Sequence, residues 1–235
     1  MRVFAISDLH LDHTNSKPMD KFGDVWAGQE DKILQSSDQL SVNEKDVLVV
    51  AGDISWAMKL ADALADFEFF KNFPCKVLIV RGNHDYWWQS VSNVRDAIPS
   101  NVIAIQNDAV KIGGIVFCGT RGWNVPETGR KQSVDDKKIY DREVIRLGLT
   151  IESAKKLQTS GEKIVLIMHY PPFNNKREDN EFLKMIRESG IETVIFGHLH
   201  GKWHKCEYKT KIDNTDFYLT SCDFLQNQIV EIAVN

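Results

Sequence analysis

The feature that most constrains the fold is a series of short apolar runs, rich in Val and Ile, which alternate with longer segments of helical pattern. The runs predict strands at 2–7, 46–51, 76–80, 102–106, 109–112, 114–119, 163–168 and 192–196, with further candidates at 203–209, 215–221 and 227–233. Helices are predicted at 28–40, 58–72, 86–97, 136–160 and 178–189. The early alternation favours parallel neighbours, whereas the Gly113 and Gly114 turn and the final stretch favour antiparallel pairing. We therefore expect an α/β protein with mixed sheets.

Length and charge narrow the classes of protein that fit. A chain of 235 residues is compatible with a single domain over 1–235, and 43% apolar with 26% charged residues is typical of a globular protein. The net charge of -4 argues against a broad electropositive surface, so extended nucleic acid is not expected as a partner. A small phosphate ligand remains compatible with this charge.

The N-terminus and the cysteines bear on location. The apolar run before Asp8 is too short for a signal peptide or a membrane span, so we expect no membrane partner and a cytoplasmic location. The four cysteines form no C-x-x-C pair and are interpreted as reduced structural thiols, namely Cys75, Cys118, Cys206 and Cys222. The sequence does not indicate an oligomeric state.

Polar side chains follow five of the predicted strands at the point where each strand ends. They are Asp8, Asp53, Asn83, His169 and His198, with His10 and His200 two residues beyond the first and the last. Because the carboxyl ends of strands form the ligand crevice of an open α/β sheet, these groups are expected to converge. Seven convergent ligands indicate two metal ions.

The types of these side chains restrict the metal. Carboxylate, amide and imidazole ligands suit divalent manganese, iron or zinc, and they do not distinguish among the three. Glycines stand beside four of the candidate ligands, at Gly52, Gly82, Gly197 and Gly201, where a tight turn or a close backbone approach lets side chains reach a common point.

Together these motifs resemble the calcineurin-like metallophosphoesterases, and the resemblance spans nearly the whole chain. The matching pieces, in the family's order, are Asp8-Leu9-His10, Gly52-Asp53, Gly82-Asn83-His84-Asp85, His169 and Gly197-His198-Leu199-His200. Each piece is weak alone, but five in order are specific. The resemblance implies a small bacterial-type member with a four-layer αββα sandwich of two mixed β-sheets flanked by helices.

The resemblance also implies a role for each matching residue. Asp8, His10 and His200 are expected to bind one metal. Asn83, His169 and His198 are expected to bind the other, and Asp53 is expected to bridge both. His84 is the expected catalytic histidine, close to the leaving oxygen. The implied reaction is hydrolysis of a small phosphomonoester or phosphodiester by a metal-activated hydroxide, since paired ions lower the pKa of a bound water toward about 7.

The chain also departs from one branch of this family. Protein Ser/Thr phosphatases carry an extended G-D-x-V-D-R-G, whereas this chain continues from Asp53 through Ile54, Ser55 and Trp56. Protein phosphatase activity is therefore not expected, nuclease activity is not favoured, and the group that orients His84 stays unassigned. The alternative function is a catalytically silent metal-binding interaction scaffold, against which the complete ligand set argues.

Several residues near the motifs keep two interpretations. His13 and His204 are interpreted as structural, and Asp85 has no assigned role. Trp87 and Trp88 are expected to pack in the core; the alternative is that they line the site together with Tyr170 and Phe173. The irregular segment 120–135 is either a candidate active-site loop or a surface connection. It carries three basic side chains that can approach a phosphate, Arg121, Arg130 and Lys131, together with Trp123.

Overall fold

Two mixed β-sheets form the centre of the molecule. The computed structural model describes residues 1–14, 17–201 and 207–234. The five-stranded sheet has the order β11-β1-β2-β3-β4, with β1 Val3–Ile6, β2 Val47–Val50, β3 Lys76–Val80, β4 Val102–Ile105 and β11 Val230–Ile232. The six-stranded sheet has the order β5-β6-β7-β8-β10-β9, with β5 Asp108–Ile112, β6 Ile115–Thr120, β7 Lys163–Met168, β8 Thr193–Phe196, β9 Lys209–Ile212 and β10 Thr215–Leu219.

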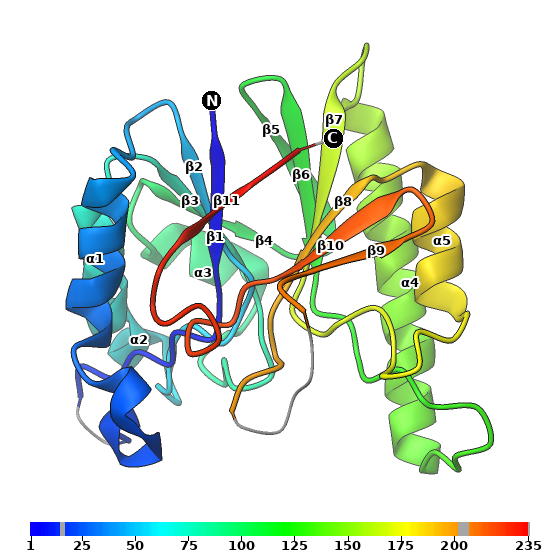
Figure 1. Ribbon diagram of the computed structural model, residues 1–235, viewed down its shortest axis with the longest axis horizontal. Helices are drawn as coiled ribbons and strands as arrows, with labels where there is room; N and C mark the ends of the chain where they lie inside the picture. Colours follow the sequence, from blue (N-terminus) through cyan, green and yellow to red (C-terminus); the bar gives the residue numbers. More distant parts are fainter. Residues whose placement is uncertain (15–16, 202–206, 235) are drawn as a thin grey trace.

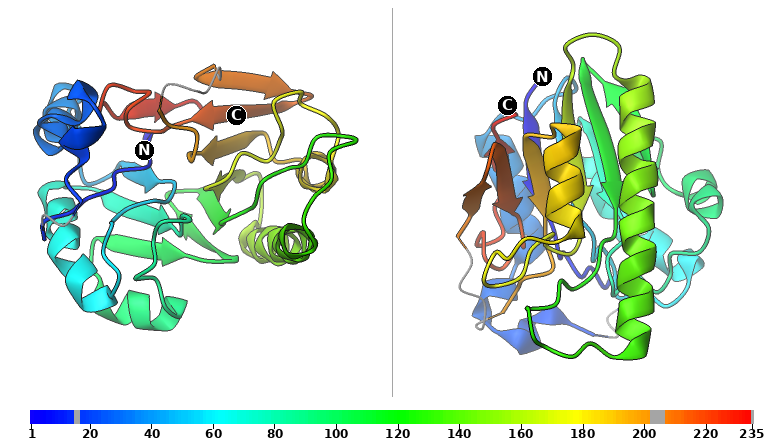
Figure 2. Two further views of the ribbon diagram at one scale, coloured as in Figure 1. Left: turned by 90° about the horizontal axis from the view of Figure 1, so that it is seen from below. Right: turned by 90° about the vertical axis from the view of Figure 1, so that its right-hand side faces the viewer.

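Helices flank the sheets on both outer faces. Helices α1 Gln29–Gln39, α2 Leu60–Phe67 and α3 Val91–Ala97 lie beside the five-stranded sheet, and α4 Val134–Leu157 and α5 Glu181–Ser189 lie beside the six-stranded sheet (Figures 1 and 2). This arrangement confirms the predicted α/β sandwich of two mixed sheets flanked by helices.

Parallel pairing dominates the interior of both sheets, as the early alternation predicted. Strands β1 to β4 pair in parallel and β11 adds an antiparallel edge. In the other sheet β6, β7, β8 and β10 are parallel, while β5 and β9 form antiparallel edges. Strands buried on both faces read as continuous Val and Ile runs. The carboxyl ends of the parallel strands therefore share one end of the molecule.

Three apolar layers hold the architecture together. Along β1, Val3 and Ala5 face the layer between the two sheets, whereas Phe4 and Ile6 belong to the layer under α1 to α3. A third layer fills the space between the six-stranded sheet and helices α4 and α5, where Leu147 and Phe182 are fully buried. Each sheet is thus covered on both faces.

Three sequence predictions need correction. The helix predicted at 86–97 begins only at Val91, because Ser90 caps it by accepting from the Asn93 N–H and the preceding residues form a turn. The segment 58–72 contains α2 and then a 3-10 helix, Glu68–Asn72. The strand predicted at 203–209 lies mostly outside the described residues, and the observed strand is β9.

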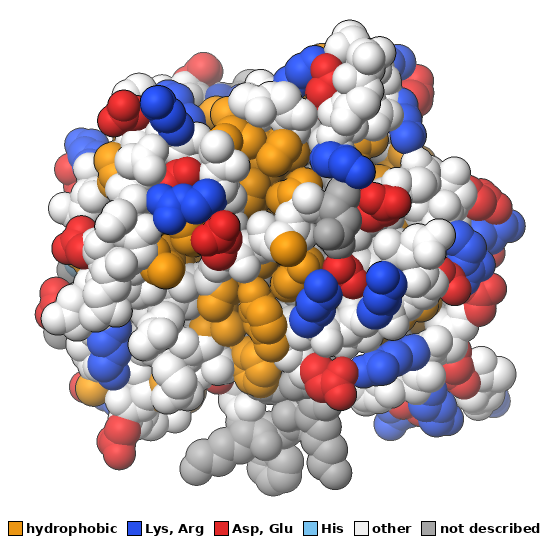
Figure 3. All heavy atoms as spheres, turned by 45° about the horizontal axis from the view of Figure 1, so that its top comes forward, with side chains coloured by type: hydrophobic (Ala, Val, Ile, Leu, Met, Phe, Trp, Pro, Cys, Tyr) orange, Lys and Arg blue, Asp and Glu red, His pale blue; other side chains and the backbone are white. Residues whose placement is uncertain are grey.

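The described cysteines are buried, and charged side chains of both signs share the surface (Figure 3). Cys75, Cys118 and Cys222 are buried free thiols, and Cys206 lies outside the described residues. Among the described residues, none of the helices is long and apolar enough to cross a membrane. On the face shown in Figure 3, basic and acidic side chains are interspersed rather than gathered by sign.

Candidate functional site

The predicted ligands follow strand ends in both sheets. Asp8, Asp53 and Asn83 come two to three residues after β1, β2 and β3, and His169 and His198 come one to two residues after β7 and β8. Four of the predicted residues have positive φ, with values of 57° at Asp8, 48° at His10, 53° at Asp53 and 70° at His198. Each such conformation costs on the order of 1–3 kcal/mol in a non-glycine residue, and this strain often marks functional sites.

One group of ligand atoms is closely assembled. The ligand atoms of Asp8, His10, Asp53 and His200 all lie within 4.8 Å of one another. Within the described residues, both ring nitrogens of His10 and Oδ2 of Asp53 are buried with no hydrogen-bond partner. Since buried polar atoms almost always have partners, and carboxylate with imidazole suits a divalent cation, these residues fit a metal ion.

A second group converges on the side chain of Asn83. Its Oδ1 lies 2.7 Å from His169 Nε2 and 2.9 Å from His198 Nδ1, and His169 Nε2 lies 3.5 Å from Asp53 Oδ2. On the other side of its ring, His169 Nδ1 lies 2.9 Å from the Ala51 carbonyl oxygen. A hydrogen bond donated there leaves the Nε2 lone pair directed at Asn83, which is the tautomer a metal ligand needs. Asp53 contacts both groups.

Burial sets the protonation of these side chains. Burial, with smaller effects of Asp85 and Asp8, raises the pKa of Asp53 to about 9. Burial lowers the pKa of His169 to about 3 and that of His198 to about 4, so both rings are neutral at pH 7. Neutral imidazoles are the form that binds metals, and a cation at Asp53 competes with a proton.

Two serines orient Asp8, and the sequence did not reveal them. Ser7 Oγ donates to Asp8 Oδ2 at 2.6 Å and Ser221 Oγ donates at 2.8 Å, while the His198 N–H donates to both carboxylate oxygens. Ser221 comes from the end of β10, which is more than two hundred residues away in sequence. These bonds fix the direction of the remaining lone pairs of Asp8.

Asp85, left without a role by the sequence, joins two of the loops that carry ligands. Its Oδ1 accepts from the N–H groups of Ile54, Ser55 and Trp87 at 2.8 to 3.2 Å. Its Oδ2 accepts from the N–H groups of Asp53 and Gly82 at 3.0 and 2.7 Å. Burial raises the pKa of Asp85 and these hydrogen bonds act against that rise. The carboxylate thereby holds the Asp53 turn beside the Asn83 turn.

His84 lies beside the ligand groups and against a tryptophan that sequence reasoning missed. Its backbone N–H donates to Asp53 Oδ1 at 2.7 Å, and its ring centroid lies 4.7 Å from that of Trp56. Trp56 also stacks on His10 with ring centroids 4.5 Å apart and an interplanar angle of 16°. Burial and the nearby His200 lower the pKa of His84. The signal for Trp56 was its position three residues after Asp53.

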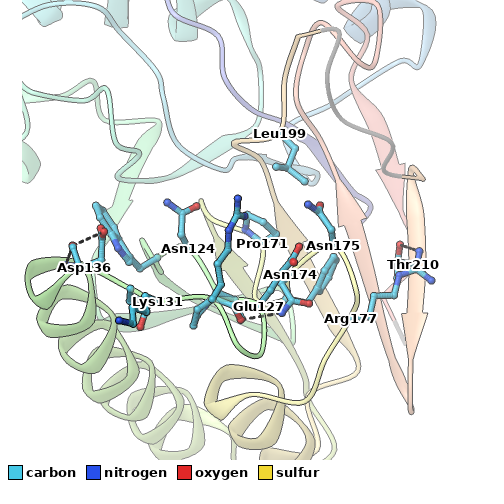
Figure 4. Close-up of a pocket in the computed structure, with 17 residues that line it drawn as sticks. Asn124, Glu127, Lys131, Asp136, Pro171, Asn174, Asn175, Arg177, Leu199 and Thr210 are labelled. Carbon is cyan, nitrogen blue, oxygen red and sulfur yellow. Dashed lines mark hydrogen bonds between the residues drawn. The ribbon is translucent and has the colours of Figure 1, made fainter.

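A cavity of about 760 Å³ lies beside the segments that follow His169 and His198, although among the described residues no predicted ligand lines it (Figure 4). Residues 123–127 and 130–133 line one side, residues 171 and 173–175 line another, and Leu199 stands between His198 and His200 at its border. Trp123 packs on Tyr170 at 5.2 Å, and Tyr170 packs on His198 at 4.0 Å between ring centroids. Most of the segment predicted as a candidate loop therefore lines a cavity whose wall includes Leu199, the residue between His198 and His200.

The other residues that the sequence singled out lie as follows. Trp87 and Trp88 are buried in the layer under α1 to α3, so they pack rather than wall the site. His13 lies 2.9 Å from Asp66 and 3.1 Å from Glu30 and lines a separate cavity with His10. Arg130 and Lys131 line the large cavity, Arg121 pairs with Glu143 instead, and His204 lies outside the described residues.

Comparison with known proteins identifies similar chains. A family model described as calcineurin-like phosphoesterase matches residues 1–202. The phosphopantetheinyl hydrolase of Mycobacterium tuberculosis is 15% identical with a TM-score of 0.60, covering 100% of this chain and 96% of its own.

Two further solved structures share the fold. A protein of unknown function from Aquifex aeolicus is 14% identical with a TM-score of 0.52, covering 98% of this chain and 95% of its own. The calcineurin-like phosphoesterase YfkN of Bacillus subtilis is 15% identical with a TM-score of 0.51, covering 95% and 82%. At these identities the similarity shows a shared fold alone. A search of the curated proteins gives no match.

Proposed function

This chain belongs to the calcineurin-like phosphoesterase family, and from that premise we propose that it hydrolyses a small phosphate ester with two divalent metal ions. The observation that carries the proposal is the convergence of two ligand groups on Asp53. Four ligand atoms within 4.8 Å of one another form the first group, and Asn83 with His169 and His198 forms the second.

The two groups divide the ligands between two ions. As the motifs imply, Asp8, His10 and His200 would hold one ion, Asn83, His169 and His198 would hold the other, and Asp53 would contribute to both. Manganese, iron and zinc all fit these nitrogen and oxygen ligands. When bound, such a pair supplies an acidified water and neutralises charge on the phosphoryl oxygens.

His84 acts on the leaving oxygen of the ester. Its backbone is fixed by Asp53 and its ring by Trp56, so the imidazole is held beside both ligand groups. Because burial lowers the pKa of His84, the ring donates a hydrogen bond to the leaving oxygen from its neutral form near pH 7.

The adjoining cavity receives the part of the substrate that does not react. Its volume of about 760 Å³ falls within the roughly 300–1,000 Å³ of small-molecule sites. The segment 120–135 thus contributes an active-site wall. The competing function is a metal-binding scaffold without turnover. Against it, the sequence has the expected type of residue at every predicted ligand position and at His84.

The test is hydrolysis of bis-p-nitrophenyl phosphate and p-nitrophenyl phosphate by metal-stripped protein, with and without added manganese. Asp53→Asn is expected to abolish turnover and lower metal content. His84→Ala is expected to lower kcat roughly 10²- to 10⁴-fold while two ions per chain remain by mass spectrometry. His13→Ala is the matched control and keeps its activity. Absence of turnover with two ions bound would favour the scaffold.

A further inference from the structure

Two arginines pair with one buried glutamate close to the proposed metal centre, and a third, Arg81, lies within electrostatic range of all three. Arg81 directly follows β3, Arg121 directly follows β6, and Arg146 and Glu143 come from α4. Glu143 is fully buried, and its Oε1 lies 2.6 Å from Arg146 Nη1 and 3.3 Å from Arg121 Nη2. We call Arg81, Arg121 and Arg146 the arginine cluster.

The charge of this cluster is not balanced by its glutamate. Three guanidinium groups against one carboxylate leave two positive charges. Across residues 1–14, 17–201 and 207–234, the side chain of Arg81 has no hydrogen bond or ion pair to another residue, and the Nε atoms of Arg81 and Arg121 are buried without partners. Arg81, Arg121 and Arg146 are each partly buried, and a partly desolvated positive charge without a full set of partners favours an added anion.

Tyr170 and Trp123 connect the cluster to the proposed active site. Tyr170 packs on His198, and the backbone N–H groups of His169 and Tyr170 donate to the Arg121 carbonyl oxygen at 3.1 and 3.0 Å. The Arg121 guanidinium lies 4.9 Å from the centre of the Trp123 ring, and Trp123 lines the large cavity. An anion at the cluster would therefore lie close to the metal ligands and to the cavity.

We propose that the arginine cluster binds a second, terminal phosphoryl group of the substrate. This substrate class, a phosphate ester with an additional phosphoryl group, rests on the proposed function. Guanidinium forks match phosphoryl oxygens in pairs. A terminal phosphoryl group carries roughly -1.5 to -2 charge at pH 7, which balances the two excess positive charges, whereas a carboxylate balances half of them.

Binding is tested first without metal or turnover. Calorimetry of chelator-treated protein with inorganic pyrophosphate is expected to show affinity that falls with added salt and falls at least about tenfold in Arg81→Gln. Arg142→Gln is the matched control. Arg142 is exposed on α4, one turn before Arg146 of the cluster, and the substitution removes the same charge. Equal affinity in wild type and Arg81→Gln overturns the site.

If the arginines and Glu143 only hold α4 against the strand ends, a different result is expected for Glu143→Gln. If the cluster binds an anion, Glu143→Gln removes the competing carboxylate and tightens pyrophosphate binding, and pyrophosphate raises the Tm of this variant more than that of wild type. If the residues only brace α4, the variant loses stability and pyrophosphate restores none of it. The second outcome overturns the proposal.

Kinetics distinguish a substrate phosphoryl group from free phosphate. With manganese, Arg81→Gln is expected to raise KM for adenosine 3′,5′-bisphosphate at least about tenfold relative to Arg142→Gln, with KM for adenosine 5′-monophosphate unchanged. If the cluster binds only free phosphate, Arg81→Gln leaves both KM values unchanged and alters only inhibition by the phosphate product. That result overturns the substrate assignment. If neither adenosine ester is hydrolysed although p-nitrophenyl phosphate is, the substrate assignment fails and the proposed function stands. If no ester is hydrolysed, the proposed function fails, while the metal-free titration still reports on the cluster.

Discussion

Asp85→Asn is expected to destabilise the protein strongly, because the carboxylate accepts five hydrogen bonds from two separate loops. An asparagine has one oxygen, so its amide group must face either the two donors at Oδ2 or the three at Oδ1. In the less costly orientation, two hydrogen bonds to a charged acceptor are lost at about 1.5–3 kcal/mol each, or about 3–6 kcal/mol in total.

The assay is urea unfolding of chelator-treated protein, followed by tryptophan fluorescence, with Asp96→Asn as the control. Asp96 is exposed on α3, so the same substitution there is expected to change the free energy of unfolding by no more than roughly 0.5 kcal/mol. Because Asp85 also positions the Asp53 turn, the folded fraction of Asp85→Asn should bind manganese more weakly. A loss in Asp85→Asn equal to that in Asp96→Asn would refute the role assigned to this carboxylate.

Three further results are expected. Ser221→Ala should weaken metal binding by roughly 10- to 100-fold, measured by competition with a chelating dye, because Asp8 loses a donor that orients it. Trp123→Ala should raise KM with metal content unchanged, since Trp123 lines the cavity and packs on Tyr170 rather than on a predicted ligand; a fall in metal content would contradict this. The pKa of Asp53 is raised to about 9 in the folded metal-free protein. Between the ordinary pKa of an aspartate and pH 9, the folded protein therefore holds a proton that the unfolded chain has released. Stability should therefore fall as pH rises from 7 to 9, where the histidines no longer titrate, and Asp53→Asn should lose this slope in urea unfolding.

The sequence predicted the elements that depend on local pattern. The Val and Ile runs located the strands because burial on both faces leaves a continuous apolar stretch, and the polar residues just past them located the side chains that the fold brings together. Asp85, Ser221 and Arg81 had no such signal, because their partners are fixed by the packing of distant loops. The start of α3 was missed for a related reason: Trp87 is buried and its ring N–H donates to Asp85, which holds residues before Ser90 in a turn.

The ligand loops are held in place by contacts within the protein. The Asp8 N–H donates to the Gly52 carbonyl and the His10 N–H to the Asp53 carbonyl, at 2.9 and 3.0 Å. A Cβ at Gly82 would collide with the Asp53 carboxylate, so only glycine permits this approach. These bonds and the close packing maintain the positive φ values at Asp8, His10 and Asp53. Since the strain is offset by the fold itself, the metal-free protein should keep this arrangement, and the proposed hydrolysis should return when manganese is added after treatment with a chelator.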